Sequence, residues 1–216
     1  MNARGTIILL EAFRKYCSSS STFIHMSTNK VYGDGPNNLD ILENDTRWEY
    51  RDPLYREIGI PETFSIDNCL HSLVGASKVS ADIIAQEYGK YFNLNVGIFR
   101  GGCLTGPQHT GVELHGFLSY IVKCAISKKH YTIYGYGGKQ VRDQIHCDDV
   151  AALFEKFIEN PRKGEVYNLG GGYKNSASVL EIIETLSERY DLNLSHTIEK
   201  ENRIGDHICY YSDLRK

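Results

Sequence analysis

The 216-residue sequence lacks long hydrophobic runs, dense clusters of Lys or Arg, and cysteines in C-x-x-C spacing. Because no apolar stretch approaches the roughly 20 residues of a membrane span, we expect no transmembrane helix. A net charge of -3 without a basic segment argues against general nucleic-acid binding, which requires a basic surface. The six scattered cysteines predict no metal site or disulfide framework, and favour reduced thiols in a cytoplasmic protein.

The glycine-rich fingerprint of dinucleotide-binding folds, Gly-x-x-Gly-x-x-Gly in a first strand–helix turn, is also missing. In such folds the glycines let the backbone and a helix N-terminus receive the pyrophosphate. Gly170–Gly172 does not replace the fingerprint, because Asn175 stands where the related pattern Gly-x-Gly-x-x-Gly has its last glycine and because the segment lies late in the chain. Residues 6–16 already show a helical apolar pattern, so we expect the chain to start within a larger α/β domain.

Helix-type and strand-type patterns alternate along the chain, which favours a mostly parallel sheet with helices on both faces. We expect Asp148 or Asp149 to cap one helix, and Ser178 with Glu181 to form a capping box. Residues 34–70 show weak periodicity and are expected to form a long loop with short turns. Apolar spacing predicts helices at 6–16, 75–93, 112–127, 178–189 and one ending near 157, and strands at 22–27, 95–100, 131–134, 140–146, 165–169 and 194–199.

Five segments carry motifs that together span most of the chain: Ser27-Thr-Asn-Lys-Val-Tyr-Gly-Asp34, Gly75-Ala-Ser-Lys78, Arg100-Gly-Gly-Cys-Leu-Thr-Gly-Pro107, Val141-Arg-Asp-Gln-Ile-His146 with Asp149, and Arg203-x-Gly-Asp206 with Asp213 and Lys216. In this order they resemble the extended short-chain dehydrogenase/reductase family of NAD-dependent nucleotide-sugar epimerases and dehydratases. Within that family, the stretches are most similar to the CDP-paratose 2-epimerase branch.

The resemblance implies a Rossmann-like, N-terminally truncated, mostly parallel sheet with a smaller C-terminal α/β domain for the substrate. Residues 1–105 would be the remainder of the NAD-binding domain. Residues 106–216 would mainly bind the nucleotide sugar, with some segments returning to the first sheet. The implied reaction uses tightly held NAD to oxidise a sugar carbon of a CDP-hexose to a ketone, which is then reduced from the opposite face. A homodimer through the helix at 75–93 is a further family-level expectation.

The resemblance also implies roles for residues around the reacting sugar. Thr28 would hydrogen-bond the reacting sugar oxygen, and Lys78 would hold the nicotinamide ribose. Gly102 and Cys103 lie in the segment beside the nicotinamide, where the family commonly has Asn at the position of Cys103.

A second group of residues is implied to bind the nucleotide part of the substrate. Tyr134 is expected to border the nucleotide base. Arg142 and Arg203 are expected to bind the diphosphate, because a planar guanidinium matches phosphate oxygens in pairs.

Val74 stands where the family has the tyrosine of its Tyr-x-x-x-Lys motif, the general acid/base. An aliphatic side chain cannot transfer a proton, so another group must do so in an active enzyme. His71, three positions earlier, is a candidate replacement, because histidine side chains commonly act as general acids and bases. Two alternatives stand beside the NAD-dependent epimerase: an inactive fragment or degenerate homologue that at most binds nucleotide sugar, and a split enzyme with its glycine-rich half on another chain.

Overall fold

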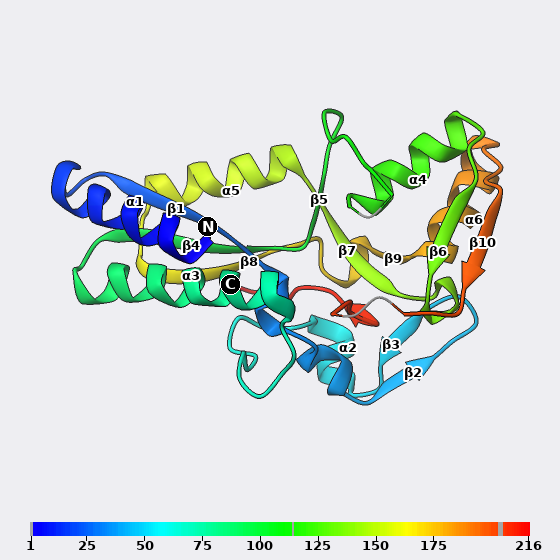
Figure 1. Ribbon diagram of the computed structural model, residues 1–216, viewed down its shortest axis with the longest axis horizontal. Helices are drawn as coiled ribbons and strands as arrows, with labels where there is room; N and C mark the ends of the chain where they lie inside the picture. Colours follow the sequence, from blue (N-terminus) through cyan, green and yellow to red (C-terminus); the bar gives the residue numbers. More distant parts are fainter. Residues whose placement is uncertain (1, 114, 203–204) are drawn as a thin grey trace.

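The computed structural model confirms an α/β fold with mostly parallel sheets (Figure 1). One parallel sheet has the strand order β1-β4-β8, with β1 at Thr22–Thr28, β4 at Asn95–Gly101 and β8 at Lys163–Leu169. Every residue of the central strand β4 is buried, as expected for a parallel strand covered on both faces. The structure describes all residues except 1, 114, 203 and 204.

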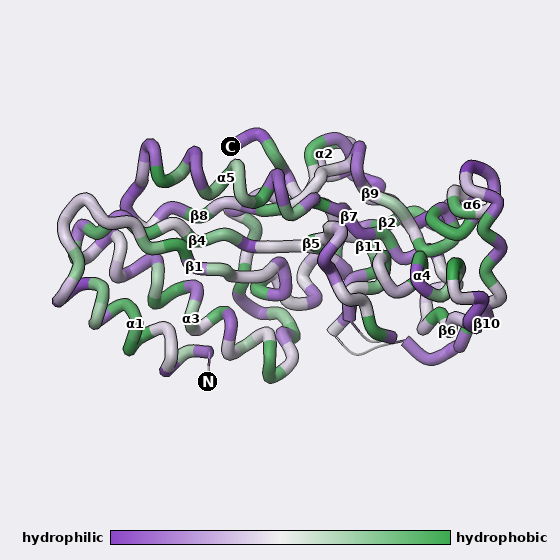
Figure 2. Tube along the Cα trace, turned by 90° about the horizontal axis from the view of Figure 1, so that it is seen from above, coloured by the Kyte–Doolittle hydropathy of each residue, from purple (hydrophilic) through white to green (hydrophobic). Residues whose placement is uncertain are grey.

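Helices cover both faces of this sheet, and Figure 2 shows α1 and α3 on one side of the three strands and α5 on the other. Their bounds are Asn2–Tyr16 for α1, Ser72–Tyr91 for α3 and Cys147–Glu159 for α5. The α1/α3 side buries Leu10 and Ala85 against Val96, Ile98 and Val166, and the α5 side buries Val150 and Phe157 against Phe99 and Leu169. Each of the Leu, Val, Ile and Phe side chains contributes about 1.5–3 kcal/mol relative to an exposed one.

A buried polar network lies between α3 and the sheet. Arg100 of β4 donates from Nε and Nη2 to both carboxylate oxygens of Asp82 on α3, at 3.1 and 2.9 Å. Ser27, near the end of β1, also donates to Asp82. Arg100 Nη1 donates to the Tyr32 hydroxyl at 3.2 Å, and that hydroxyl donates to Asn168 of β8 at 2.7 Å. Because its members satisfy one another, this network fixes the end of β1 and the turn that follows it.

Smaller sheets make up the rest of the molecule (right and lower parts of Figure 1). One has the order β11-β7-β5 with β9 antiparallel to β7, β6 pairs with β10 in parallel, and β2 and β3 form a hairpin. The bounds are β2 Ile41–Glu43, β3 Trp48–Tyr50, α2 Pro53–Ile58, β5 Cys103–Thr105, α4 Phe117–Ile126, β6 Tyr131–Tyr134, β7 Val141–His146, β9 Ser176–Ser178, α6 Val179–Tyr190, β10 His196–Glu199 and β11 Cys209–Tyr210.

The predicted helices and strands are present, with three corrections. Residues 34–70 hold the β2–β3 hairpin and α2 in addition to turns. The helix expected from residue 112 begins at Phe117, because Val112 and His115 exchange backbone hydrogen bonds of 2.9 Å before it. The N-cap of α5 is His146, whose side chain accepts the backbone N–H of Asp148, and is neither Asp148 nor Asp149. The capping box of Ser178 is confirmed.

The division of the chain at residue 105 stays a prediction, as does dimerisation through α3. β8 does return to the sheet that β1 and β4 begin. None of the described helices combines the length and apolar character that crossing a bilayer requires.

Candidate functional site

A cavity of 810 Å³ brings together segments that are far apart in the sequence. Thr28 and Gly102 lie at the carboxyl ends of β1 and β4, which is where open parallel sheets bind ligands. Tyr134 ends β6, and Arg142 lies near the start of β7. The lining drawn from the predicted motif segments, from β6 and from position 74 is Thr28, Asn29, Lys30, Val74, Gly102, Cys103, Leu104, Thr105, Gly106, Tyr131, Tyr134, Arg142, Gln144 and Asp206.

Thr28 is held at the rim of the sheet by local backbone geometry. It is extended, with φ -148° and ψ 153°, and caps the 3-10 turn Asn29–Tyr32. Its hydroxyl oxygen accepts the backbone N–H of Lys30 at 3.3 Å. A hydroxyl that accepts one hydrogen bond can still donate its own proton, so Thr28 can donate to a ligand oxygen in the cavity.

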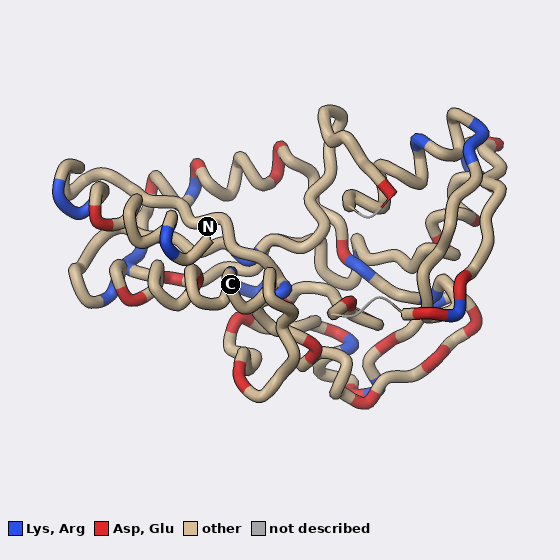
Figure 3. Tube along the Cα trace, in the orientation of Figure 1, with Lys and Arg blue, Asp and Glu red and all other residues tan. Residues whose placement is uncertain are grey.

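Three charged residues of the lining, Lys30, Arg142 and Asp206, are bonded to one another and are here called the Asp206 cluster. Lys30 Nζ and Arg142 Nη2 both donate to Asp206 Oδ1, at 3.0 and 2.8 Å. Burial alone would raise the pKa of Asp206, but the charges of Arg142 and Lys30 hold it well below its ordinary value. The cluster therefore carries two cations for one carboxylate. Figure 3 shows basic and acidic residues interspersed along the rest of the chain, so this excess is local.

The segment after β4 forms another part of the lining. The Gly102 N–H donates to Leu169 O at 2.9 Å, and a Cβ added to Gly102 would lie 3.2 Å from Asp143 Oδ1. Desolvation raises the pKa of the Cys103 thiol to about 11. Cys103 therefore stays a neutral thiol at physiological pH, which makes it a poor nucleophile.

One end of the cavity is lined by residues of β6 and α4. The Tyr134 hydroxyl donates to Glu113 Oε1 at 3.0 Å, which presents the ring as part of the lining. Arg203, the second residue predicted to bind diphosphate, lies outside the described residues.

Two predicted catalytic residues lie outside the lining. Lys78 lies on α3, one helical turn beyond Val74. Its Nζ donates to Met26 O of β1 at 3.3 Å. His71 Nε2 lies 2.8 Å from Val31 O, and because a carbonyl only accepts, this nitrogen carries the proton. Val74 itself borders the cavity and is 70% exposed. The roles of Lys78 and His71 stay predictions.

Sequence reasoning assigned no role to Lys30 or to its partner Asp206. The place of Lys30, two residues after the strand-end Thr28, could have indicated that it lies in the site. The pairing with Asp206 spans 176 positions, so no local pattern could indicate it.

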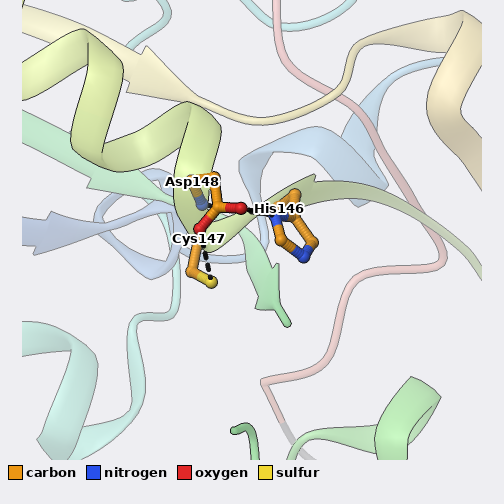
Figure 4. Close-up of side chains that lie close together, drawn as sticks. All are labelled: His146, Cys147 and Asp148. Carbon is orange, nitrogen blue, oxygen red and sulfur yellow. Dashed lines mark hydrogen bonds and ion pairs between the residues drawn. The ribbon is translucent and has the colours of Figure 1, made fainter. Parts of the chain in front are cut away.

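A separate cluster lies at the start of α5, where His146, Cys147 and Asp148 bring possible metal-ligand atoms within 4.8 Å of one another (Figure 4). These atoms already bond within the cluster. His146 Nδ1 accepts the Asp148 N–H at 3.3 Å, and the Cys147 thiol donates to Asp148 Oδ1 at 3.7 Å. The Asp148 side chain is 87% exposed. We therefore assign His146 to capping α5, and we assign no metal to the three side chains.

Known proteins resemble this chain in sequence and in structure. Residues 69–170 match the sequence model of the NAD dependent epimerase/dehydratase family. The whole chain is 32% identical to the CDP-paratose 2-epimerase of Salmonella typhi and covers 63% of that protein.

Solved structures show the same fold. The dTDP-glucose 4,6-dehydratase of Bacillus anthracis, solved with NAD, matches with a TM-score of 0.68 and 26% identity, covering 99% of this chain and 58% of its own. The UDP-glucuronic acid 4-epimerase of Bacillus cereus, solved with UDP-glucuronic acid and NAD, matches with a TM-score of 0.69 and 25% identity over 99% and 58%. The chain thus spans less than two thirds of the length of these relatives. These findings confirm the resemblance and give no support to an inactive homologue.

Proposed function

Residues 69–170 match the sequence model of the NAD dependent epimerase/dehydratase family, and on this premise we propose that the chain acts on a nucleotide-diphosphate sugar as an NAD-dependent epimerase. The relative that is 32% identical favours, as the finer proposal, 2-epimerisation of a CDP-hexose. The observation that carries the proposal is the single cavity that joins a strand-end hydroxyl, a cationic cluster and an aromatic ring.

The three parts of the cavity match the three parts of a nucleotide sugar. Arg142 supplies positive charge for a diphosphate, and its guanidinium binds phosphate oxygens in pairs. The ring of Tyr134 offers a flat surface for the base. Thr28, at the end of β1, offers its hydroxyl to the sugar.

The described residues fit one end of NAD. Lys78 donates to the backbone of β1 two residues before Thr28, which places a cation beside the strand end where the nicotinamide ribose would lie. Gly102 has no side chain, and a Cβ there would crowd Asp143. The pyrophosphate end has no matching cradle among the described residues, because Gly170–Gly172 leads into the short turn Tyr173–Asn175 and not into a long helix.

Bound NAD would supply the hydride acceptor and donor for the proposed reaction. The chain would position the sugar hydroxyl through Thr28 and hold the diphosphate through Arg142. Loss of the hydroxyl proton must then be assisted by a group other than Val74, since an alkyl side chain has no proton to exchange.

Two measurements test this proposal. The purified protein is denatured and the supernatant assayed for NAD, and the native protein is incubated with a CDP-hexose and added NAD while the sugar is followed by NMR. We expect the epimer to accumulate, and Arg142→Met to slow its formation while Lys156→Met, on the exposed face of α5, does not. Failure to find either NAD binding or product would contradict the proposal.

A further inference from the structure

We propose that the amine of Lys30 is the proton-transfer group for the reacting sugar, in the place that Val74 leaves without one. The inference rests on the proposed function, because it names the acid/base group of that same site. It is carried by the position of Lys30 in the cavity.

Lys30 lies against the first turn of α3, where Val74 is found. A Cβ added to Gly75 would lie 3.4 Å from Lys30 O, so the turn that carries Lys30 packs directly on the residue after Val74. Lys30 Nζ donates to Gly205 O at 3.0 Å, and a Cβ on Gly205 would lie 3.6 Å from the Cβ of Ser72. Both ends of the lysine are therefore held beside the start of α3.

Lys30 shares the cavity with Thr28 and Val74. The Lys30 N–H also bonds the Thr28 hydroxyl, so the two side chains start from the same short turn. A sugar oxygen bound by Thr28 would lie beside the wall formed by Lys30 and Val74. The proton of the reacting sugar hydroxyl must leave and return at this wall of the cavity.

The surroundings of Lys30 favour loss of its proton at a lower pH than an exposed lysine requires. Burial and then the charge of Arg142 lower the pKa of Lys30, while Asp206 and Cys103 partly oppose this. His207, buried beside the cluster, is held neutral and adds no charge. General acid/base catalysis is most effective when the pKa of the group lies near the working pH, and lysine reaches that range by losing solvent.

The other titratable groups near Val74 are less suited to the task. Arg142 stays charged at all working pH values. The pKa of Asp206 is lowered, and that of Cys103 is raised to about 11. His71 lies outside the cavity lining and already donates to Val31 O.

The histidines and the carboxylate at the far part of the lining are engaged elsewhere. His109 bonds Ser119 of α4, and Glu113 accepts from Tyr134 of β6. His115 lies near His109, with ring centroids 6.3 Å apart. These three groups belong to the part of the cavity beside α4 and β6, away from α3.

The proposed step balances in protons and electrons. Neutral Lys30 Nζ accepts the proton of the sugar hydroxyl while the hydrogen on the same carbon leaves as hydride to the nicotinamide oxidant, and a C=O bond forms. In the return step the hydride is added to the opposite face of that carbon. The Lys30 ammonium then gives its proton back to the oxygen, so the amine and the cofactor are regenerated.

The first test reads the amine directly and does not depend on turnover. Lysines of the full chain are reductively methylated with ¹³C and titrated by NMR, with the Lys30 signal assigned by its loss in Lys30→Arg. We expect Lys30 to titrate at lower pH than the other lysines, and lower still in Asp206→Asn, which removes the opposing carboxylate. Titration together with the surface lysines would overturn the inference.

The second test is kinetic and separates proton transfer from structure. Lys30→Met should lower kcat by about 10²–10⁴-fold, with a smaller change in KM and loss of the acidic limb of the kcat–pH profile. The double variant Lys30→Met/Val74→Tyr should recover part of kcat, because a tyrosine then supplies the missing proton. A merely structural role for Lys30 would not be rescued in this way.

The outcomes distinguish the inference from the proposed function. Turnover by wild type with an unchanged kcat and pH profile in Lys30→Met would overturn the role of Lys30 and leave the epimerase proposal standing. Absence of turnover in wild type contradicts the proposed function, and the NMR titration then decides whether Lys30 has the lowered pKa that the inference requires. Lys156→Met, which alters an exposed lysine, is the matched control for both readouts.

Discussion

Two carboxylate–arginine pairs in this molecule have nearly the same shortest N···O distance and different surroundings. Arg100 and Asp82 are 2.9 Å apart beneath the sheet, with side chains 4% and 0% exposed. Arg142 and Asp206 are 2.8 Å apart at the cavity, with side chains 9% and 27% exposed, and Asp206 also binds Lys30. The first pair is here called the Asp82 pair, to be compared with the Asp206 cluster.

The difference lies in how fully the charges are matched. In the Asp82 pair, one cation meets one anion, and Ser27, Gln86 and Tyr32 complete the hydrogen bonds. Such a network leaves nothing to offer a ligand and fixes the packing of α3 on the sheet. The Asp206 cluster sets two basic side chains, Lys30 and Arg142, against one carboxylate and faces the cavity, so Arg142 can exchange part of its bonding for a bound anion. The same residue types thus hold the fold in one place and bind in the other.

The largest effect should come from breaking the Asp82 pair. Arg100→Met leaves Asp82 buried without its cation, and we expect a loss of about 3–5 kcal/mol in the free energy of unfolding. Urea denaturation followed by circular dichroism measures this directly. A loss no greater than that of Arg142→Met would show that the two pairs do not differ in the way described.

The next effect concerns binding at the Asp206 cluster. Arg142→Met removes charged hydrogen bonds worth about 1.5–3 kcal/mol, so affinity for a nucleoside diphosphate should fall about 10–100-fold. Asp206 keeps Lys30 as a partner, so stability should fall less than in Arg100→Met. Calorimetric titration with CDP measures the affinity, and unchanged affinity would contradict the assignment of Arg142.

A pH dependence of stability sharpens the comparison through two buried histidines. Burial lowers the pKa of His207 well below its ordinary value, and Lys30 and Arg142 lower it further. Burial also lowers the pKa of His25, but Asp82 opposes this. The pKa of His207 therefore responds to the basic side chains of the Asp206 cluster, and the pKa of His25 responds to the balanced Asp82 pair.

The sign follows from proton binding. Below about pH 6.5 the unfolded chain binds a proton at each histidine before the folded chain does, so stability falls as pH decreases from there. We expect His207→Gln to flatten the decline between about pH 6.5 and 5 more than His25→Gln does. Unfolding curves at several pH values provide the measurement, and an equal or reversed order would contradict the difference in local charge.

The smallest effect should come from an ion pair that belongs to neither region. Lys156 and Glu159 are 2.7 Å apart on α5, with side chains 76% and 63% exposed. Solvent screens such a pair, so Lys156→Met should leave the unfolding midpoint unchanged within error. A shift comparable to that of Arg100→Met would mean that distance alone, and not burial, sets the value of these pairs.

Much of the α/β fold could be predicted because apolar periodicity is a local property. The boundaries of β6 and the capping box of Ser178 follow from a few neighbouring residues. The β2–β3 hairpin was not predicted, because its strands are three residues long and are stabilised by contacts made much later in the chain. Tyr50 of β3, for example, packs against Tyr211 with ring centroids 5.2 Å apart.

The candidate site also contains residues that local motifs predict and a pairing that they do not. Thr28 and Arg142 could be predicted from motifs, and the structure places both at the cavity. The pairing of Lys30 with Asp206 could not, because it joins the turn after β1 to a segment near the end of the described chain. The N-cap of α5 was assigned to the wrong residue because Asp148 and His146 differ in backbone conformation, which composition does not reveal.

The position of β8 has a consequence for how the chain folds. Ile98 of β4 is paired with Val166 of β8, and most of the cavity lining is encoded between them. On a ribosome, β1 and β4 are therefore made long before their third strand arrives, and contacts between residues so distant in sequence slow folding. We expect a cut near residue 105 to yield two pieces that need each other to become ordered, so that sheet and cavity are acquired together in one late step.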